Sequence, residues 1–195
     1  IANATGCSSI YGASYPANPY TTNAEGQGPA WANSLFEDNA EFGFGMRIAV
    51  ETMRDRIQTI MADNIDKVDE NLKALFEKWI NNRQSGAITS EIKNDLIEAV
   101  EKSDNEDVKA ILELKDYIVK RSQWIIGGDG WAYDIGYGGL DHVIANNEDV
   151  NILVLDTEVY SNTGGQSSKS SQTGSIAKFT AAGKPGKKKD LAALA

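Results

Sequence analysis

The chain has 195 residues, and its content of 41% hydrophobic and 24% charged residues is typical of a globular protein. Its 28 acidic and 19 basic residues give a formal net charge of -9, which argues against nucleic acid and anionic membranes as partners. No apolar run approaches the roughly 20 residues of a membrane span, and no signal segment opens the chain. The single cysteine, Cys7, excludes an internal disulfide framework and favours a reducing, intracellular setting.

The two ends of the chain suggest a piece of a longer protein. The sequence begins in mid-pattern at Ile1, without an initiator methionine, and stops just after Asp190, where a helix is expected to begin. Residues 1–38 are rich in Gly, Pro, Asn, Ser and Tyr and show little periodicity, so they predict mostly ordered loop.

Residues 39–122 have the pattern of amphipathic helices. Apolar residues recur along this block at three- and four-residue spacing, as one face of a helix requires. The pattern breaks near Asn64, at 81–86 and at 103–104. We therefore predict that residues 54–120 form a helical insertion within a single domain that spans residues 1–195.

The last third of the chain predicts strands instead. Residues 123–126 and 151–155 are short apolar runs, and residues 133–145 between them can form a helix. A strand, a helix and a second buried strand form a right-handed parallel unit, so we predict an α/β fold with a central parallel sheet flanked by helices. Ligands of such sheets bind beyond the carboxyl ends of the strands, here at 127–130 and 156–158.

The first of these strand ends carries a Gly-Asp-Gly motif centred on Asp129. A dinucleotide fingerprint would need a third glycine where the chain has Tyr133, and no Walker phosphate-binding motif occurs. A carboxylate at a strand end suits a diphosphate held through a bridging Mg²⁺, because this ion shares carboxylate and phosphate oxygens. A plain turn is the alternative interpretation.

The second strand end strengthens this interpretation. Its loop contains Asn162, which lies 33 positions after Asp129. One strand–helix–strand step of about 30 residues places two neighbouring strand ends at the same edge of a sheet. A side-chain oxygen and a backbone carbonyl of this loop would then join Asp129 around one metal ion. The paired motifs are the pattern of thiamine-diphosphate-binding domains.

A closer resemblance extends over nearly the whole chain. The segments that carry it are 4–12, 28–46, 127–142 and 156–169. They resemble the pyruvate:ferredoxin (flavodoxin) oxidoreductase family, and specifically its thiamine-diphosphate-binding domain, which lies toward the C-terminal end of a far longer polypeptide. The helical block matches least distinctively, and at 170–173 related chains more often carry a proline.

The resemblance implies a role for each candidate site residue. Asp129, the Thr157 side chain and the Val159 backbone carbonyl would bind Mg²⁺ on the diphosphate. Asn162 would reach toward the reactive end of the cofactor as the catalytic candidate, and Cys7 would be one of four thiolates on a [4Fe–4S] cluster. The residues expected to line the cofactor are Gly128, Asp129, Gly130, Trp131, Thr157, Glu158, Val159, Tyr160, Ser161 and Asn162.

The activity that the resemblance implies is oxidative decarboxylation of pyruvate to acetyl-CoA and CO₂, with electrons passing through iron–sulfur clusters to ferredoxin or flavodoxin. The implied partners are pyruvate, coenzyme A, the remaining domains of the parent chain and a second subunit of a homodimer. The implied location is the cytoplasm, or a hydrogenosome-like organelle in an anaerobic eukaryote. The piece alone is expected to be inactive, since other domains contact the substrate. Two alternatives stay open: another thiamine-diphosphate-dependent 2-oxoacid oxidoreductase, or a non-catalytic binding module.

Other chemically suggestive residues have plainer interpretations. His142, the only histidine, lies on the expected crossover helix, where a structural or surface role is favoured. The lysines at 184 and 187–189 predict a solvated loop, and docking of acidic coenzyme A or ferredoxin is the alternative. Glu158 could be a catalytic carboxylate, but the sequence does not show whether it faces the cofactor or a neighbouring side chain.

Overall fold

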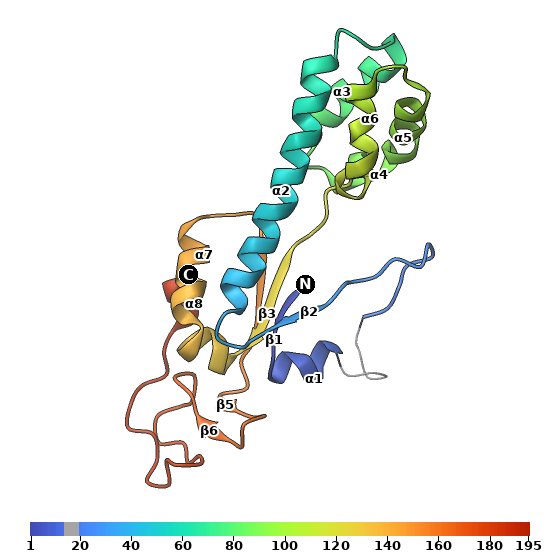
Figure 1. Ribbon diagram of the computed structural model, residues 1–195. Coiled ribbons are helices and arrows are strands. Elements are labelled where there is room, and N and C mark those ends of the chain that lie inside the picture. The colour runs from blue at the N-terminus through green and yellow to red at the C-terminus, as the bar shows by residue number, and fades with distance from the viewer. Residues whose placement is uncertain (14–19) are drawn as a thin grey trace. The chain divides into compact units, whose positions relative to one another are not determined.

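The computed structural model describes residues 1–13 and 20–195 (Figure 1). Two compact units are present: Ile1–Arg47 together with Gln123–Ala195, and Ile48–Ser122. Helix α2 (Asn39–Asn64) contributes residues to both units. The assignment of residues 54–120 as an insertion within one domain stays a prediction.

The first unit contains a parallel sheet. Within the described residues its strands are β1 (Ala2–Ala4), β2 (Ala32–Ser34), β3 (Trp124–Gly128) and β4 (Asn151–Leu155), in the order β2-β1-β3-β4. All neighbouring strands run parallel, with Ala2 opposite both Ala32 and Ile125, and Gly128 opposite Leu155. This confirms the predicted α/β fold with a central parallel sheet.

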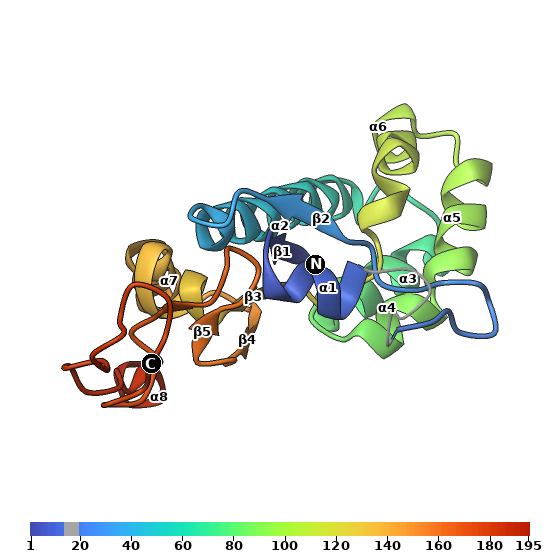
Figure 2. The same cartoon turned by 90° about the horizontal axis from the view of Figure 1, so that it is seen from below.

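Helices cover both faces of this sheet (Figure 2). On one face, Ile125 of β3 lies in a buried cluster with Ala40 of α2 and with Leu140 and Val143 of α7 (Tyr137–Ala145). On the other face, Asn3 of β1 donates a hydrogen bond from Nδ2 to Ser9 Oγ of α1 (Cys7–Ala13) at 3.1 Å. The alternation of side chains along a strand places these two contacts on opposite faces.

Most of the described residues in 1–38 are loop, as predicted, but the prediction missed three short elements: β1, α1 and β2. The two strands have three residues each, too few to show a two-residue period. Both strands pair within the parallel sheet, so tertiary hydrogen bonds supply what the local pattern lacks. The part of the prediction that concerns residues 14–19 lies outside the described residues.

The predicted helix at 133–145 begins earlier and in a different form. Gly130–Ile135 form a π-helix, η2, and α7 follows from Tyr137. The Gly136 N–H donates to the Trp131 carbonyl at 2.8 Å, a bond across five residues that characterises this wider turn. This wide turn directly follows the strand end at which a ligand is predicted to bind. Single π-helical turns are frequent at functional sites.

Beyond β4 the chain forms a short hairpin of β5 (Val159–Tyr160) and β6 (Gln166–Ser167), whose strands run antiparallel. Helix α8 (Leu191–Leu194) begins after Asp190, whose Oδ1 accepts a hydrogen bond from Ala193 N at 3.0 Å. This capping confirms the helix start expected there.

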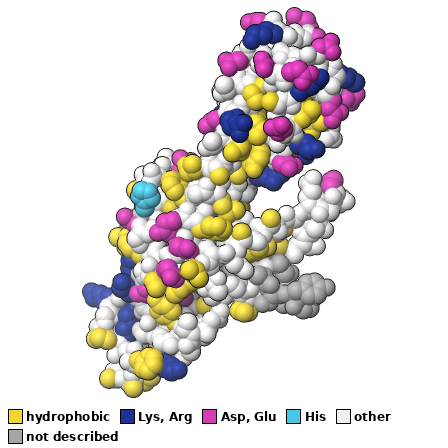
Figure 3. All heavy atoms as spheres, in the orientation of Figure 1, with side chains coloured by type: hydrophobic (Ala, Val, Ile, Leu, Met, Phe, Trp, Pro, Cys, Tyr) yellow, Lys and Arg dark blue, Asp and Glu magenta, His cyan; other side chains and the backbone are white. Residues whose placement is uncertain are grey.

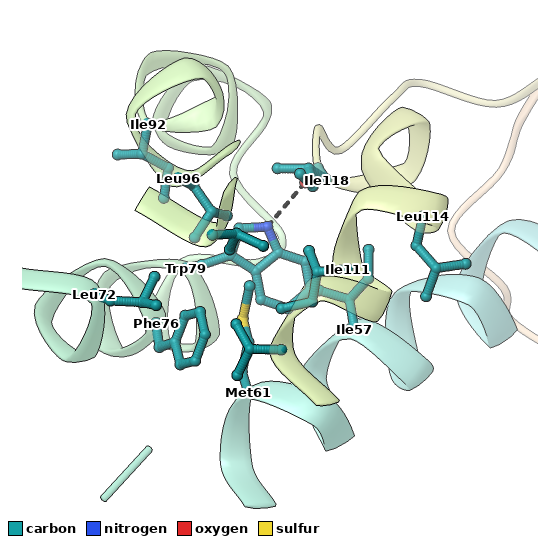
Figure 4. Packing of buried hydrophobic residues seen from close by; sticks show 12 residues of the cluster. Ile57, Met61, Leu72, Phe76, Trp79, Ile92, Leu96, Ile111, Leu114 and Ile118 are labelled. Carbon is teal, nitrogen blue, oxygen red and sulfur yellow. Dashed lines mark hydrogen bonds between the residues drawn. The ribbon is translucent and has the colours of Figure 1, made fainter. Parts of the chain in front are cut away.

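The second unit is helical, as predicted. After α2 it contains α3 (Glu70–Asn81), α4 (Gly86–Glu91), α5 (Lys93–Lys102), α6 (Glu106–Lys109) and a 3₁₀ helix, η1 (Ala110–Tyr117). The buried Trp79 lies at the centre of its core and donates from Nε1 to the Ile118 carbonyl at 2.9 Å (Figure 4). Acidic and basic side chains gather on the outside of these helices (Figure 3), as amphipathic helices require.

No helix among the described residues combines the length and the apolar character that crossing a membrane demands.

The N-terminus of α3 offers a test of the helical unit. Asp69 accepts a hydrogen bond from Leu72 N at 2.9 Å and so caps the helix. We expect Asp69→Ala to destabilise the helix by about 1 kcal/mol, measured by faster native-state hydrogen exchange of the α3 amides. Asp66→Ala is the control, because Asp66 makes an exposed ion pair with Lys73 and caps no helix. Equal exchange in the two variants would contradict the capping role.

Candidate functional site

The two predicted loops meet at the carboxyl end of the sheet. Gly128 of β3 and Leu155 of β4 are opposite each other, so the residues that follow them are neighbours. Thr157 Oγ1 lies 2.9 Å from Asp129 Oδ1 and 3.2 Å from the Val159 carbonyl oxygen. A hydroxyl carries one hydrogen, so at any moment it donates to one of these two oxygens. The structure thus brings together the residues that the sequence proposed as metal ligands.

This group of oxygens fits a small divalent cation. A carboxylate, a hydroxyl and a backbone carbonyl are all hard oxygen ligands, the kind that Mg²⁺ prefers. No cluster of three or more His, Cys, Asp or Glu side chains suited to a metal occurs in residues 1–13 and 20–195. With Asp129 as its only charged ligand, the group suits an ion that takes its remaining ligands from phosphate and water.

Asp129 is fully buried, and both of its oxygens accept hydrogen bonds. Ser168 Oγ donates to Oδ2 at 2.6 Å, and the Thr157 hydroxyl lies against Oδ1. Burying a carboxylate is unfavourable unless its oxygens find donors, so these hydroxyls satisfy a group that would otherwise oppose folding. Ser168 was not a candidate in the sequence, where it stands in an unremarkable serine-rich loop.

A pocket lies beside these oxygens. Gly128, Gly130, Trp131, Val159, Tyr160, Ser161 and Asn162 line it, together with residues 4–7, Phe36 and Thr163. Tyr160 closes on Gly130: its hydroxyl donates to the Gly130 carbonyl at 3.3 Å, and a Cβ at Gly130 would lie 2.5 Å from the Tyr160 ring. Burial raises the pKa of Tyr160 to about 12, so its hydroxyl stays protonated and can donate. Most of the predicted cofactor-lining residues therefore share one pocket.

Cys7 lies at the same site. It opens α1, and its Sγ is 3.8 Å from Thr157 Oγ1. A Cβ added to Gly128 would approach the same sulfur to 3.6 Å. Because the sequence contains one cysteine, a [4Fe–4S] cluster here would draw its other thiolates from outside this chain.

Glu158 contacts side chains from later in the chain instead of lining the pocket. Its carboxylate accepts from Lys188 Nζ at 3.0 Å and from Gln172 Nε2 at 2.9 Å, and its backbone has φ +62°. The hydrogen bonds from Lys188 and Gln172 lower the pKa of Glu158 below its ordinary value. The φ value is rare for a residue with a side chain, which indicates that the surrounding contacts hold the backbone in place.

Lys188 Nζ also donates a hydrogen bond to Asp156 Oδ2 at 2.8 Å. Burial would raise the pKa of Asp156, but the hydrogen bonds from Lys188, Ser170 and Tyr133 keep it below its ordinary value. The same contacts with Asp156 and Glu158 raise the pKa of Lys188. The loop between β4 and β5 is therefore held by ion pairs to residues 184–189, the lysine-rich segment.

Two further lysines of this segment have structural contacts. Lys184 Nζ donates to the Ser171 carbonyl at 2.6 Å. Lys189 Nζ lies 3.0 Å from the centre of the Tyr137 ring and donates to the Tyr133 carbonyl at 3.1 Å. The interpretation of this segment as a docking surface therefore loses support, because most of its charge is engaged within the chain.

The role of Lys188 can be tested against its neighbour. We expect Lys188→Ala to speed hydrogen exchange at the amides of residues 156–160, because Asp156 and Glu158 lose their shared cation. Lys187→Ala is the matched control, since Lys187 is exposed. Unchanged exchange in Lys188→Ala, or the same change in both variants, would show that the ion pairs do not hold the loop.

His142 is exposed on α7, with its ring edge-on to Phe44 at 5.9 Å between ring centres. It does not line the pocket. This position agrees with the surface role favoured from the sequence.

Part of the chain matches a family of thiamine-diphosphate enzymes. Residues 108–195 match the family described as thiamine pyrophosphate enzyme, C-terminal TPP binding domain. This match covers the π-helix, both candidate loops and the lysine-rich segment. The site therefore lies in a region with the sequence pattern of thiamine-diphosphate-binding domains.

Individual relatives resemble the chain over its whole length. It is 56% identical to the pyruvate-flavodoxin oxidoreductase of Klebsiella pneumoniae and 54% identical to the pyruvate:ferredoxin oxidoreductase of Moorella thermoacetica. It is also 50% identical to the mitochondrial pyruvate dehydrogenase [NADP(+)] of Euglena gracilis. Each comparison covers the whole of this chain. The chain spans 17%, 17% and 11% of the lengths of these three relatives, in the order given. The resemblance identified in the sequence is confirmed.

Proposed function

We propose that this chain binds the Mg²⁺-diphosphate of thiamine diphosphate within an enzyme that oxidatively decarboxylates pyruvate. The proposal depends on one observation: the Asp129 carboxylate, the Thr157 hydroxyl and the Val159 carbonyl lie together at the carboxyl end of the sheet. It is supported by the family match over residues 108–195 and by the names of the relatives.

In this proposal the residues of the chain bind the cation and enclose the cofactor. Asp129, Thr157 and Val159 hold the cation, while Gly128 and Gly130 allow Cys7 and the Tyr160 ring to pack closely against the strand end. Bound thiamine diphosphate supplies a nucleophilic carbon and an electron sink for cleavage of the bond between the keto carbon and the carboxylate. Asn162, which lines the pocket, is the candidate to contact the reacting part of the cofactor.

The overall reaction that we propose for the full-length protein converts pyruvate and coenzyme A into acetyl-CoA, CO₂, a proton and two electrons. The electrons pass one at a time through iron–sulfur clusters to ferredoxin or flavodoxin. Cys7 would supply one thiolate to the cluster nearest the cofactor, and its 3.8 Å distance from Thr157 supports that proximity. The remaining domains and a second subunit of a homodimer would complete the site, in the cytoplasm or in a hydrogenosome-like organelle.

The name of one relative suggests an alternative final electron acceptor. The protein of Euglena gracilis is named as a pyruvate dehydrogenase that uses NADP⁺. It is 50% identical to this chain, which supports the idea that this region does not determine the final electron acceptor. We therefore assign the acceptor to parts of the protein outside the site described above.

The test uses the full-length protein under anaerobic conditions. Reduction of a viologen dye is followed with pyruvate and with other 2-oxoacids in turn, each with and without coenzyme A. The proposal expects reduction to be fastest with pyruvate and to be lost without coenzyme A. A different preferred acid would change the substrate, and no reduction in protein loaded with iron and thiamine diphosphate would favour the non-catalytic binding module.

A further inference from the structure

Ser168 is held in one orientation by its own loop. It follows β6 directly and is 4% exposed. Its Oγ accepts a hydrogen bond from Ser170 N at 3.1 Å, and its own N–H donates to Ser171 Oγ at 2.9 Å. With an acceptor position of its oxygen already used, the hydroxyl directs its single hydrogen at Asp129 Oδ2, 2.6 Å away.

This contact makes the two oxygens of Asp129 different. Oδ2 is occupied by Ser168, while Oδ1 faces Thr157 Oγ1, which in turn lies near the Val159 carbonyl. The terminal torsion of an aspartate is broad, so a carboxylate without such a contact turns easily. The Ser168 bond therefore fixes which oxygen points toward the other candidate ligands.

We propose that Ser168 is a positioning residue: by binding Oδ2 it fixes the Asp129 carboxylate so that Oδ1 alone is presented to the divalent cation. The proposal rests on the proposed function, because it takes Asp129 as a ligand of that cation. Partners that orient a metal ligand through a hydrogen bond change metal affinity by about 10- to 100-fold when they are removed. Ser168→Ala is expected to weaken cation binding by that factor.

Ser170 provides the matched control. It is also buried, and its hydroxyl also donates to a carboxylate, that of Asp156. Ser168→Ala and Ser170→Ala therefore remove the same group from the same loop, and each leaves one carboxylate oxygen without its serine donor. Only Ser168 reaches the candidate ligand Asp129.

The experiment measures Mn²⁺ binding to the full-length protein, with saturating thiamine diphosphate, by electron paramagnetic resonance. Ser168→Ala should raise the dissociation constant by about 10- to 100-fold and change the spectrum of bound Mn²⁺. Ser170→Ala should lower thermal stability but leave the constant and the spectrum close to wild type. Should Ser168→Ala not fold, Ser168→Cys keeps a weak donor, and an intermediate dissociation constant is expected for it.

The outcomes separate this inference from the proposed function. Equal weakening in Ser168→Ala and Ser170→Ala would indicate general loosening of the loop and would overturn the positioning role. Normal Mn²⁺ binding in Ser168→Ala, together with loss of binding in Asp129→Ala, would overturn the inference and leave the proposed function standing. Wild-type protein that binds no Mn²⁺ with thiamine diphosphate would overturn the proposed function itself.

Discussion

Asp129→Ala is expected to abolish Mg²⁺-dependent retention of thiamine diphosphate by the full-length protein. Asp129 is the only carboxylate in the proposed ligand group, so its removal leaves a hydroxyl and a carbonyl to hold a doubly charged ion. The loss should exceed the roughly 10- to 100-fold effect typical of a residue that merely orients a ligand. Equilibrium dialysis with and without Mg²⁺ measures it.

Two further variants make this result specific. Asp129→Asn keeps the volume of the buried side chain but removes its charge, and it should also lose retention. Asp141→Ala removes an exposed carboxylate of α7 and should retain the cofactor as wild type does. Retention of thiamine diphosphate by folded Asp129→Ala protein would rule out the metal assignment.

Gly127→Ala is expected to destabilise the sheet next to the site by about 3 kcal/mol, because the added methyl group overpacks a rigid region. A Cβ at this position would lie 2.3 Å from Cε3 of the fully buried Trp131. On its other edge the same ring meets Gly136, where a Cβ would lie 2.2 Å from Cδ1. The ring is therefore packed closely along two of its edges, which limits how far it can move.

Hydrogen exchange at the β3 and β4 amides measures this effect, and 3 kcal/mol corresponds to about 100-fold faster exchange. Gly138→Ala in α7 is the control, because a Cβ there meets no atom within 4 Å. A helical Gly→Ala change should leave stability equal or slightly higher. Unaltered exchange in Gly127→Ala would mean that Trp131 moves aside at little cost.

The sequence predicts those helices and strands whose hydrophobic pattern extends over enough residues to be recognised. The apolar runs at 123–126 and 151–155 correspond to β3 and β4, and the breaks in the helical block match the ends of α2, α3 and α5. The strands β1 and β2 escaped prediction because three residues carry too little periodicity. Their position in the sheet depends on partners far away in the sequence.

The candidate site was predicted in outline. Adjacent strand ends follow from the geometry of a parallel unit, so the meeting of Asp129 with Thr157 could be expected. The hydrogen bond of Ser168 to Asp129 and the ion pairs of Lys188 could not, because each joins segments at least 30 residues apart through loops without a regular period. Glu158 illustrates the same limit, since only the structure shows that it faces Lys188.

The most direct test of the account is a crystal structure of the full-length protein with thiamine diphosphate and Mg²⁺. We expect one cation that lies about 2.0–2.1 Å from one oxygen of each of Asp129, Thr157 and Val159, with diphosphate oxygens among its remaining ligands. A cofactor bound at another strand edge, or a cation at the diphosphate without Asp129 among its ligands, would contradict it.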